Sequence, residues 1–100
     1  MAYFLLRLRS PRPTFPFDAS EAEMARMKEH AAFWQGQADA GAAIVVRPVF
    51  DPAGTWGMEV EEVEDEPAAQ ALLRADPAIA ADLGFSYDVL PVPSLILRRG

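Results

Sequence analysis

The stretch Ser20–Val49, SEAEMARMKEHAAFWQGQADAGAAIVVRPV, decides the fold because a strong helix pattern passes directly into a strand pattern. Ser20, followed three residues later by Glu23, forms a capping box, which is typical of a helix start. Gly41 supplies the residue that commonly ends a helix. The sequence therefore predicts a long helix over Glu21–Ala40.

The apolar side chains of this helix share a stripe roughly 80° wide, which we expect to pack on a sheet. His30, the only histidine of the chain, lies at the edge of that stripe, one turn before Trp34, where its imidazole can enter a cleft. It is also the only side chain whose unperturbed pKa is near neutrality. It is either an acid–base group or a boundary histidine without a role. The stripe comprises Met24, Met27, Ala31, Trp34 and Ala38.

Two strands follow the helix and flank the turn-rich segment Asp51–Gly54, so we predict a hairpin. The first covers Ala43–Val49, and in the second the apolar residues Trp56, Met58 and Val60 alternate with Gly57, Glu59 and Glu61. Glu59–Glu66 holds six carboxylates in eight positions. Such a run is usually a solvated strand end that leads into a helix, and we favour this over a metal site.

The rest of the chain supplies the other elements of one α+β domain. Asp76 before Pro77 is a cap followed by proline at the first helical position, which predicts the start of a short helix. The βαββαβ order is that of a ferredoxin-like fold, an antiparallel sheet with helices on one face. We expect the other face to be buried against a second copy, in a homodimer. The remaining predicted elements are strands at Tyr3–Arg9 and Phe85–Val92, helices at Glu66–Ala75 and Pro77–Leu83, and a short terminal strand at Leu95–Leu97.

Length and composition limit the partners. One hundred residues support a single core, so we expect one domain over residues 1–100. A net charge of −6 disfavours nucleic acid, whose binding depends on Lys and Arg. The apolar start of the chain is too short for a signal peptide or a membrane span, so we expect a cytoplasmic protein with no membrane contact. We expect no metal or other cofactor, because phosphate-binding glycine loops and Cys or multi-His clusters are missing.

Further residues qualify as site candidates. Asp76 can orient and polarise an imidazole, although its capping role already explains it. Arg12 and Arg47 can dock an anionic substrate; Arg47 can instead snorkel or pair with the acidic run. Trp34 and Trp56 can wall a pocket for an aromatic ligand, although large aromatics at such spacing are more often core.

The sequence resembles the YCII-related, or YciI-like, family over nearly its whole length. The resemblance implies a ferredoxin-like fold paired as a dimeric α/β barrel, with a His and Asp pair carried here by His30 and Asp76. Similar members usually have glycine before the hairpin proline, where this chain has Arg47; that arginine can close or redirect the site. The motifs that carry the resemblance are Pro11–Phe15, Glu29-His30 with Trp34, Val49–Gly57 and Ala75–Pro77.

Two functions compete at this stage. The first is a small-molecule enzyme, isomerase- or lyase-like, in which His30 and Asp76 perform acid–base chemistry on a small anionic substrate such as an aromatic compound or a lactone. The second is a non-catalytic dimeric domain that binds a ligand or docks a partner. A cleft that holds both His30 and Asp76 favours the first, whereas a histidine facing solvent favours the second.

Overall fold

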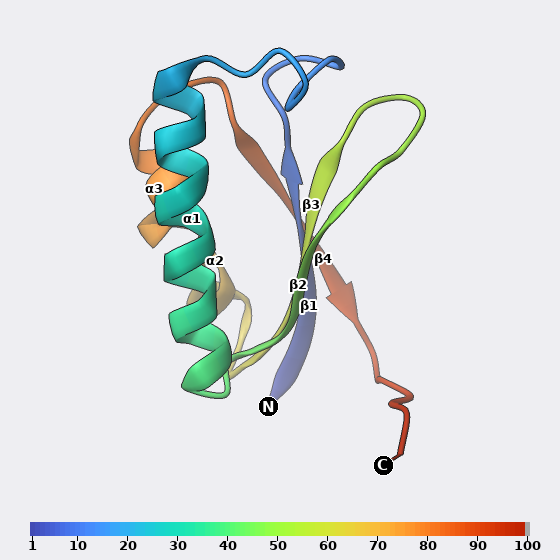
Figure 1. Ribbon diagram of the computed structural model, residues 1–100. Coiled ribbons are helices and arrows are strands. Elements are labelled where there is room, and N and C mark those ends of the chain that lie inside the picture. The colour runs from blue at the N-terminus through green and yellow to red at the C-terminus, as the bar shows by residue number, and fades with distance from the viewer. Residues whose placement is uncertain (100) are drawn as a thin grey trace.

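A four-stranded antiparallel sheet carries three helices on one of its faces (Figure 1). The computed structural model describes residues 1–99. Its strand order is β2-β3-β1-β4, and this topology confirms the predicted ferredoxin-like α+β fold. The elements, in chain order, are β1 (Ala2–Arg9), α1 (Glu21–Asp39), β2 (Ala43–Val49), β3 (Trp56–Val63), α2 (Glu66–Ala75), α3 (Pro77–Ala80) and β4 (Ser86–Val92).

Strand β1 lies between β3 and β4 and supplies the centre of the core. Its residues Phe4, Leu6 and Leu8 alternate toward the helices, and each is at most 5% exposed. Leu6 packs in one cluster with Trp34 of α1, and Leu8 packs in a second cluster with Phe15 of the loop before α1. The two clusters hold the helices on the sheet through apolar burial.

Helix α1 begins as predicted, but it turns a different face inward. The Ser20 hydroxyl accepts from the Glu23 backbone N–H and the Glu23 carboxylate accepts from the Ser20 N–H, which completes the capping box. The less exposed positions include Met27, His30 and Trp34, whereas Met24 is 53% exposed. The predicted stripe is therefore rotated. His30 lies within the inward face rather than at its edge, while Ala31 and Ala38 are exposed.

Strand β3 is turned over relative to the expectation from its hydrophobic alternation. Glu59 and Glu61, expected in a solvated run, are both 0% exposed and face the helices opposite Leu6 and Phe4 of β1. The alternating set, which includes Met58, faces away from the helices. Alternation separates the two faces of a strand but does not say which face packs on the helices. Both faces of this sheet carry apolar side chains.

Three boundaries in the last third of the chain differ from the predictions. Helix α3 ends at Ala80 rather than Leu83, because Asp82 adopts a left-handed φ of 53° and the chain turns. Strand β4 begins one residue late, at Ser86. The segment Leu95–Leu97 forms no strand, since it extends beyond the sheet without a pairing partner. Within residues 1–99, no helix is both long and apolar enough to cross a membrane.

Candidate active site

Asp76 stands at the junction of α2 and α3, and its two carboxylate oxygens have different tasks. Oδ1 accepts a hydrogen bond of 2.9 Å from the backbone N–H of Ala78, which caps α3 as the Asp-Pro pattern predicted. The side chain is fully buried. Because the cap uses one oxygen, Oδ2 is left to face α1 and the sheet.

Oδ2 of Asp76 gathers three side chains from two other elements. It lies 2.7 Å from His30 Nδ1, 3.0 Å from Trp34 Nε1 and 2.5 Å from the Tyr87 hydroxyl. Burial alone raises the pKa of Asp76, but the hydrogen bonds from His30, Tyr87 and the Ala78 backbone outweigh it, so the pKa is below the ordinary value. An ionised carboxylate only accepts hydrogen bonds, so Nδ1 of His30 carries the proton and Nε2 presents a lone pair.

Glu59 lies on the other side of the His30 ring. Its Oε1 is 3.4 Å from His30 Nε2 and 3.2 Å from the Tyr87 hydroxyl. Burial raises the pKa of Glu59 to about 8, and the nearby charges of Asp76 and Glu61 act in the same direction. Glu61, two residues further along β3, has its pKa raised to about 7 by burial. Both carboxyl groups therefore hold protons near neutral pH far more than ordinary glutamates do.

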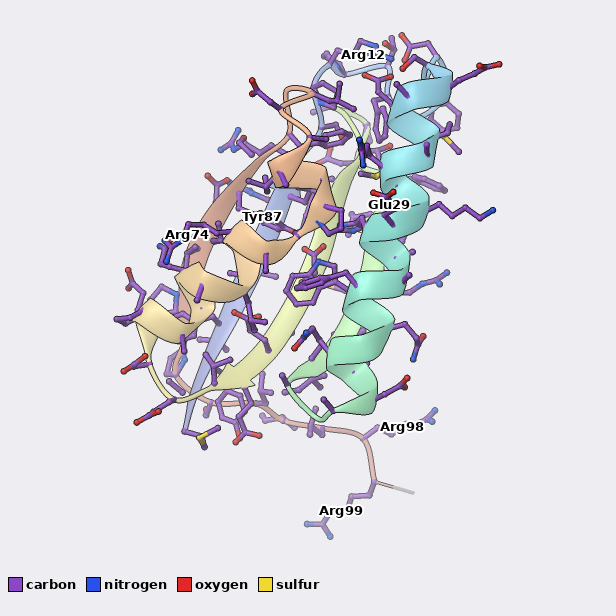
Figure 2. The ribbon with its side chains drawn as sticks, turned by 90° about the vertical axis from the view of Figure 1, so that its left-hand side faces the viewer. Arg12, Glu29, Arg74, Tyr87, Arg98 and Arg99 are labelled. Atoms are coloured by element: carbon purple, nitrogen blue, oxygen red, sulfur yellow. The ribbon has the colours of Figure 1, made fainter. Side chains whose placement is uncertain are left out.

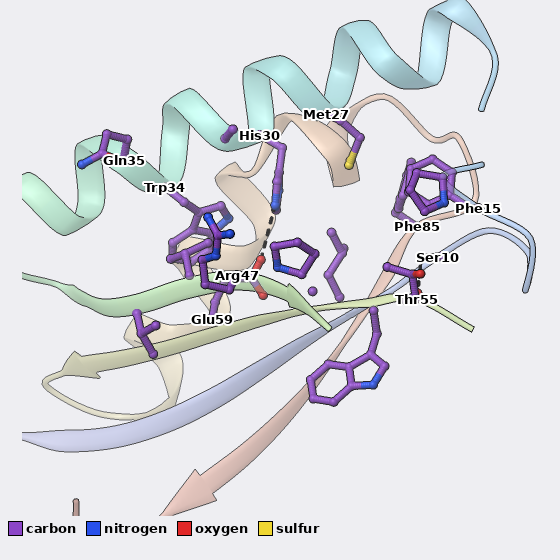
Figure 3. A pocket seen from close by; sticks show the side chains of 18 of the residues that line it. Ser10, Phe15, Met27, His30, Trp34, Gln35, Arg47, Thr55, Glu59 and Phe85 are labelled. Atoms are coloured by element: carbon purple, nitrogen blue, oxygen red, sulfur yellow. Dashed lines mark hydrogen bonds and ion pairs between the residues drawn. The ribbon is translucent and has the colours of Figure 1, made fainter. Parts of the chain in front are cut away.

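His30 opens onto a cavity of about 460 Å³ that lies between α1 and the β2–β3 edge of the sheet (Figure 3). The His30 side chain is 12% exposed, and it reaches solvent through this cavity. Arg47 lines the same cavity from the edge strand and is exposed. A cavity of this size, mostly apolar with few polar groups, suits a small molecule. Its apolar walls include Leu8, Phe15, Met27, Trp34, Pro48 and Phe85.

The other predicted ligand-contacting residues divide between the cavity and its surroundings. Trp34 is fully buried and holds Asp76 as well as lining the cavity. Trp56 also borders the cavity, but Arg7 of β1 lies over its ring, 5.8 Å from the centroid, and its indole N–H donates to Asp51 at 3.3 Å. Arg47 leaves the cavity open, and among residues 1–99 it has no carboxylate partner.

Arg12 is not brought to this cavity. It lies in the loop at the N-terminal end of α1 (Figure 2). Its guanidinium binds Asp18 at 3.0 Å and Glu23 at 2.7 and 2.8 Å. The arginine ties the loop to the first turn of α1, and its donors are occupied by those carboxylates.

Glu59 and Tyr87 are the site residues that the sequence reasoning missed. Glu59 was assigned to a solvated run, and Tyr87 was only one residue of a strand. A signal for Tyr87 exists, because β4 pairs with β1 so that Tyr87 lies opposite Leu8, a position of the core face. Glu59 has no comparable signal in the sequence, because its position follows only from the pairing of β3 with β1.

The arrangement can remove and return protons. Nε2 of His30 is an oriented base, Asp76 stabilises the imidazolium that forms when it accepts a proton, and Glu59 is a neutral acid beside it. Within residues 1–99, no group of three or more His, Cys, Asp or Glu is arranged so that it could hold a metal ion. The hydrogen bonds and pKa values of these side chains support proton transfer.

Comparison with known proteins identifies the family. A search of curated proteins gave no match. The sequence profile of the YCII-related domain matches residues 1–93, which is nearly the whole chain. The predicted resemblance is thus confirmed, and the chain belongs to the YCII-related family.

Proposed function

We propose that this protein is a small-molecule enzyme in which His30 is the general base and acid, with Asp76 as its orienting partner. The observation that carries the proposal is the 2.7 Å hydrogen bond from His30 to a buried carboxylate, in a ring that lines an accessible cavity and has its other nitrogen 3.4 Å from Glu59. A carboxylate in this position fixes the tautomer and raises the basicity of Nε2. The reaction is isomerase- or lyase-like, and it begins with removal of a proton from carbon.

The cavity limits the substrate to a compact and largely apolar molecule, such as a lactone or a small aromatic compound. Glu59 lines the cavity beside His30, and the charged Asp76 is bonded to the His30 ring, so a substrate anion is unfavourable near His30. Arg47 is the cation among the residues that line the cavity. We therefore assign a substrate carboxylate to the Arg47 side, with the reacting carbon toward His30.

Small unsaturated lactones test this proposal directly. A panel of butenolides, with and without a carboxymethyl arm, is followed by absorbance as the double bond moves into conjugation. His30→Ala should reduce turnover by roughly 10²–10⁴-fold, the usual contribution of a positioned acid–base group. Circular dichroism checks that the variant folds, and Glu29→Gln, on the exposed face of the same helix, is the matched control. Turnover by His30→Ala at the wild-type rate would refute the assignment.

A binding module without chemistry is the second candidate, and the apolar walls of the cavity favour it. Such a module would bind members of the same panel, measured by quenching of the fluorescence of Trp34 and Trp56, without converting any of them. His30→Ala would then leave the dissociation constants nearly unchanged. Saturable binding combined with no conversion, across the panel, would replace the enzyme proposal with this one.

We also propose that the face of the sheet opposite the helices is covered by a second copy. Met58 and Val60 of β3 are only partly buried on this face, and Leu90 of β4 is 42% exposed. Apolar sheet faces of this kind commonly pack against each other in isologous dimers. Light scattering coupled to size-exclusion chromatography should give twice the chain mass of 11.0 kDa. Leu90→Asp should shift the protein toward the monomer, and a wild-type monomer at every concentration would refute the dimer.

A further inference from the structure

The carboxyl group of Glu59 receives no hydrogen bond of its own, because the neighbouring donors give their hydrogens to Asp76. Its Oε1 is within 3.2 Å of the Tyr87 hydroxyl and 3.4 Å of His30 Nε2, and its Oε2 is buried without a partner. Tyr87 has a single hydroxyl hydrogen, and Asp76 is the closer acceptor at 2.5 Å. His30 likewise gives its Nδ1 proton to Asp76.

A buried carboxylate that receives no hydrogen bond is costly, so this carboxyl carries its own proton. Two acceptors lie within reach of Oε1, the lone pair of His30 Nε2 and the oxygen of Tyr87. Burial also raises the pKa of Tyr87, so its hydroxyl keeps its hydrogen. The only proton that can move between Glu59 and a neighbouring base is therefore the one between Glu59 and His30.

We propose that Glu59 is a second acid–base group of the site, which shares one proton with Nε2 of His30. The inference rests on the proposed function and narrows its substrate class to carbonyl compounds that isomerise by transfer of a proton between two carbons. His30 takes a proton from the carbon beside the carbonyl, and the C–H electron pair becomes the double bond of an enolate. Glu59 gives its proton to the distant carbon, and the proton on His30 then returns to Glu59. The substrate loses one proton and gains one, so the enzyme is regenerated.

The groups that face Glu59 come from every element packed around it. His30 faces it from α1, Tyr87 from β4 and Asp76 from the α2–α3 junction, while Glu61 lies on its own strand. Its neighbours in register are apolar, Leu6 on β1 and Val46 on β2. Within residues 1–99, no Lys or Arg forms an ion pair with it. The imidazole is thus the positively chargeable group that can stabilise a Glu59 carboxylate.

Glu61 provides a matched control, because it lies on the same strand and the same face. It is equally buried, and both of its oxygens lack partners. It forms no hydrogen bond with His30, Asp76 or Tyr87 within the part of the chain that the structure describes. Glu61→Gln therefore removes a buried carboxyl of the same kind without removing a group that contacts the shared proton, and the loss of its charge should only lower the pKa of Glu59.

NMR titration of the untagged protein tests the sharing without any substrate. The chain has one histidine, so its ring nitrogen and carbon signals need no assignment. In the wild type, these signals and the Glu59 side-chain carboxyl carbon should move together in a step near pH 8, where the pKa of Glu59 lies. Glu59→Gln should abolish this step in the histidine signals, and Glu61→Gln should retain it. A wild-type histidine with no step near pH 8, or a step that survives in Glu59→Gln, overturns the inference.

Activity measurements separate this inference from the function on which it rests. With a butenolide that the wild type isomerises, in deuterium oxide, Glu59→Gln should still exchange the acidic C–H for deuterium but should isomerise at least tenfold more slowly. His30→Ala should lose both reactions. Isomerisation by Glu59→Gln at the wild-type rate overturns the role of Glu59 and leaves His30 as the base. A shared proton in the NMR titration without turnover of any lactone overturns the proposed function alone.

Discussion

Helix α1 contacts two clusters of carboxylates whose negative charges are compensated in different ways. At its N-terminal end, Asp18 and Glu23 both bind Arg12, in what we term the Arg12 cluster. In its middle, Asp76 and Glu59 surround His30, in what we term the His30 cluster. The first neutralises its negative charges with a permanent cation. The second contains no Lys or Arg among the described residues and relies on protons instead.

The pKa values follow from this difference. Hydrogen bonds from Arg12 lower the pKa of Glu23 to about 2, while burial raises the pKa of Glu59 to about 8. The Arg12 cluster therefore keeps one charge state across the physiological range, as a structural fastening should. The His30 cluster changes its protonation close to neutrality, which is where an acid–base catalyst has to operate. The four acidic groups near this helix thus differ in the protonation states that they adopt near neutral pH.

Among the substitutions in the two clusters, Asp76→Asn should reduce activity most. An amide has one oxygen, so it cannot both cap Ala78 and accept from His30, Trp34 and Tyr87. If its NH₂ group faces His30, it donates to Nδ1 and forces the proton onto Nε2, which can no longer act as a base. We expect turnover of the active lactone to fall by roughly 10³–10⁴-fold. Steady-state kinetics measure the loss.

Asp18→Asn is the matched control for this prediction, since it makes the same chemical change in the Arg12 cluster. It should leave turnover unchanged. The long-range nitrogen spectrum of the single histidine should also show Nδ1 protonated in the wild type and in Asp18→Asn, but an altered tautomer in Asp76→Asn. Equal turnover of the two variants would mean that Asp76 serves only as a helix cap.

Glu61 should make the free energy of unfolding depend on pH. Its pKa is raised from 4.5 to about 7 on folding, so the folded protein favours the protonated form. The corresponding stability is complete below pH 4.5 and is lost as the pH rises through about 7. The upper limit of this loss is roughly 3 kcal/mol. Glu61→Gln should flatten the decline of the unfolding free energy between about pH 4.5 and 7, measured by urea denaturation. A decline as steep as that of the wild type would show that Glu61 is not the source.

The sequence predicted the helices and strands around the site better than the residues inside it. Local signals, the Ser20–Glu23 capping box and the Asp76-Pro77 start, predicted helix positions correctly because capping depends on a few adjacent residues. The approach of Asp76 to His30 was implied by family resemblance and not by spacing, since 46 positions separate them. Glu59 was misjudged because hydrophobic alternation identifies two faces without saying which one meets the helices.

That failure has a physical origin in the fold itself. Strand β3 reverses the usual rule that the apolar side of a strand points to the core, because its acidic residues lie under the helices and its apolar residues lie on the open face. The acidic residues of β3 could be placed only after its pairing with Leu6 and Phe4 of β1 was known. Departures from local rules are expected where a site is built, because buried carboxyls reduce stability and are kept for their chemistry.

Substitution in the Arg12 cluster should have a small effect on stability and none on turnover. Arg12→Gln removes the guanidinium that binds Asp18 and Glu23, and its side chain is 35% exposed, so solvent screening limits the loss. We expect the melting temperature to fall by a few degrees at neutral pH, with turnover unchanged. Arg12→Lys keeps the charge but not the forked donors, so its melting temperature should lie between those of the wild type and Arg12→Gln.

The stability difference between the wild type and Arg12→Gln should depend on pH with the opposite sign to the effect expected from Glu61. The pKa of Glu23 is lowered on folding, so the stability it contributes is present above its ordinary value of 4.5 and disappears as the pH falls through about 2. The melting temperatures of the wild type and of Arg12→Gln should therefore converge on acidification, whereas those of the wild type and of Glu61→Gln should change relative to each other between about pH 4.5 and 7. A gap between wild type and Arg12→Gln that persists at pH 2 would show that the guanidinium acts through packing of its stem, and not through the carboxylates that it binds.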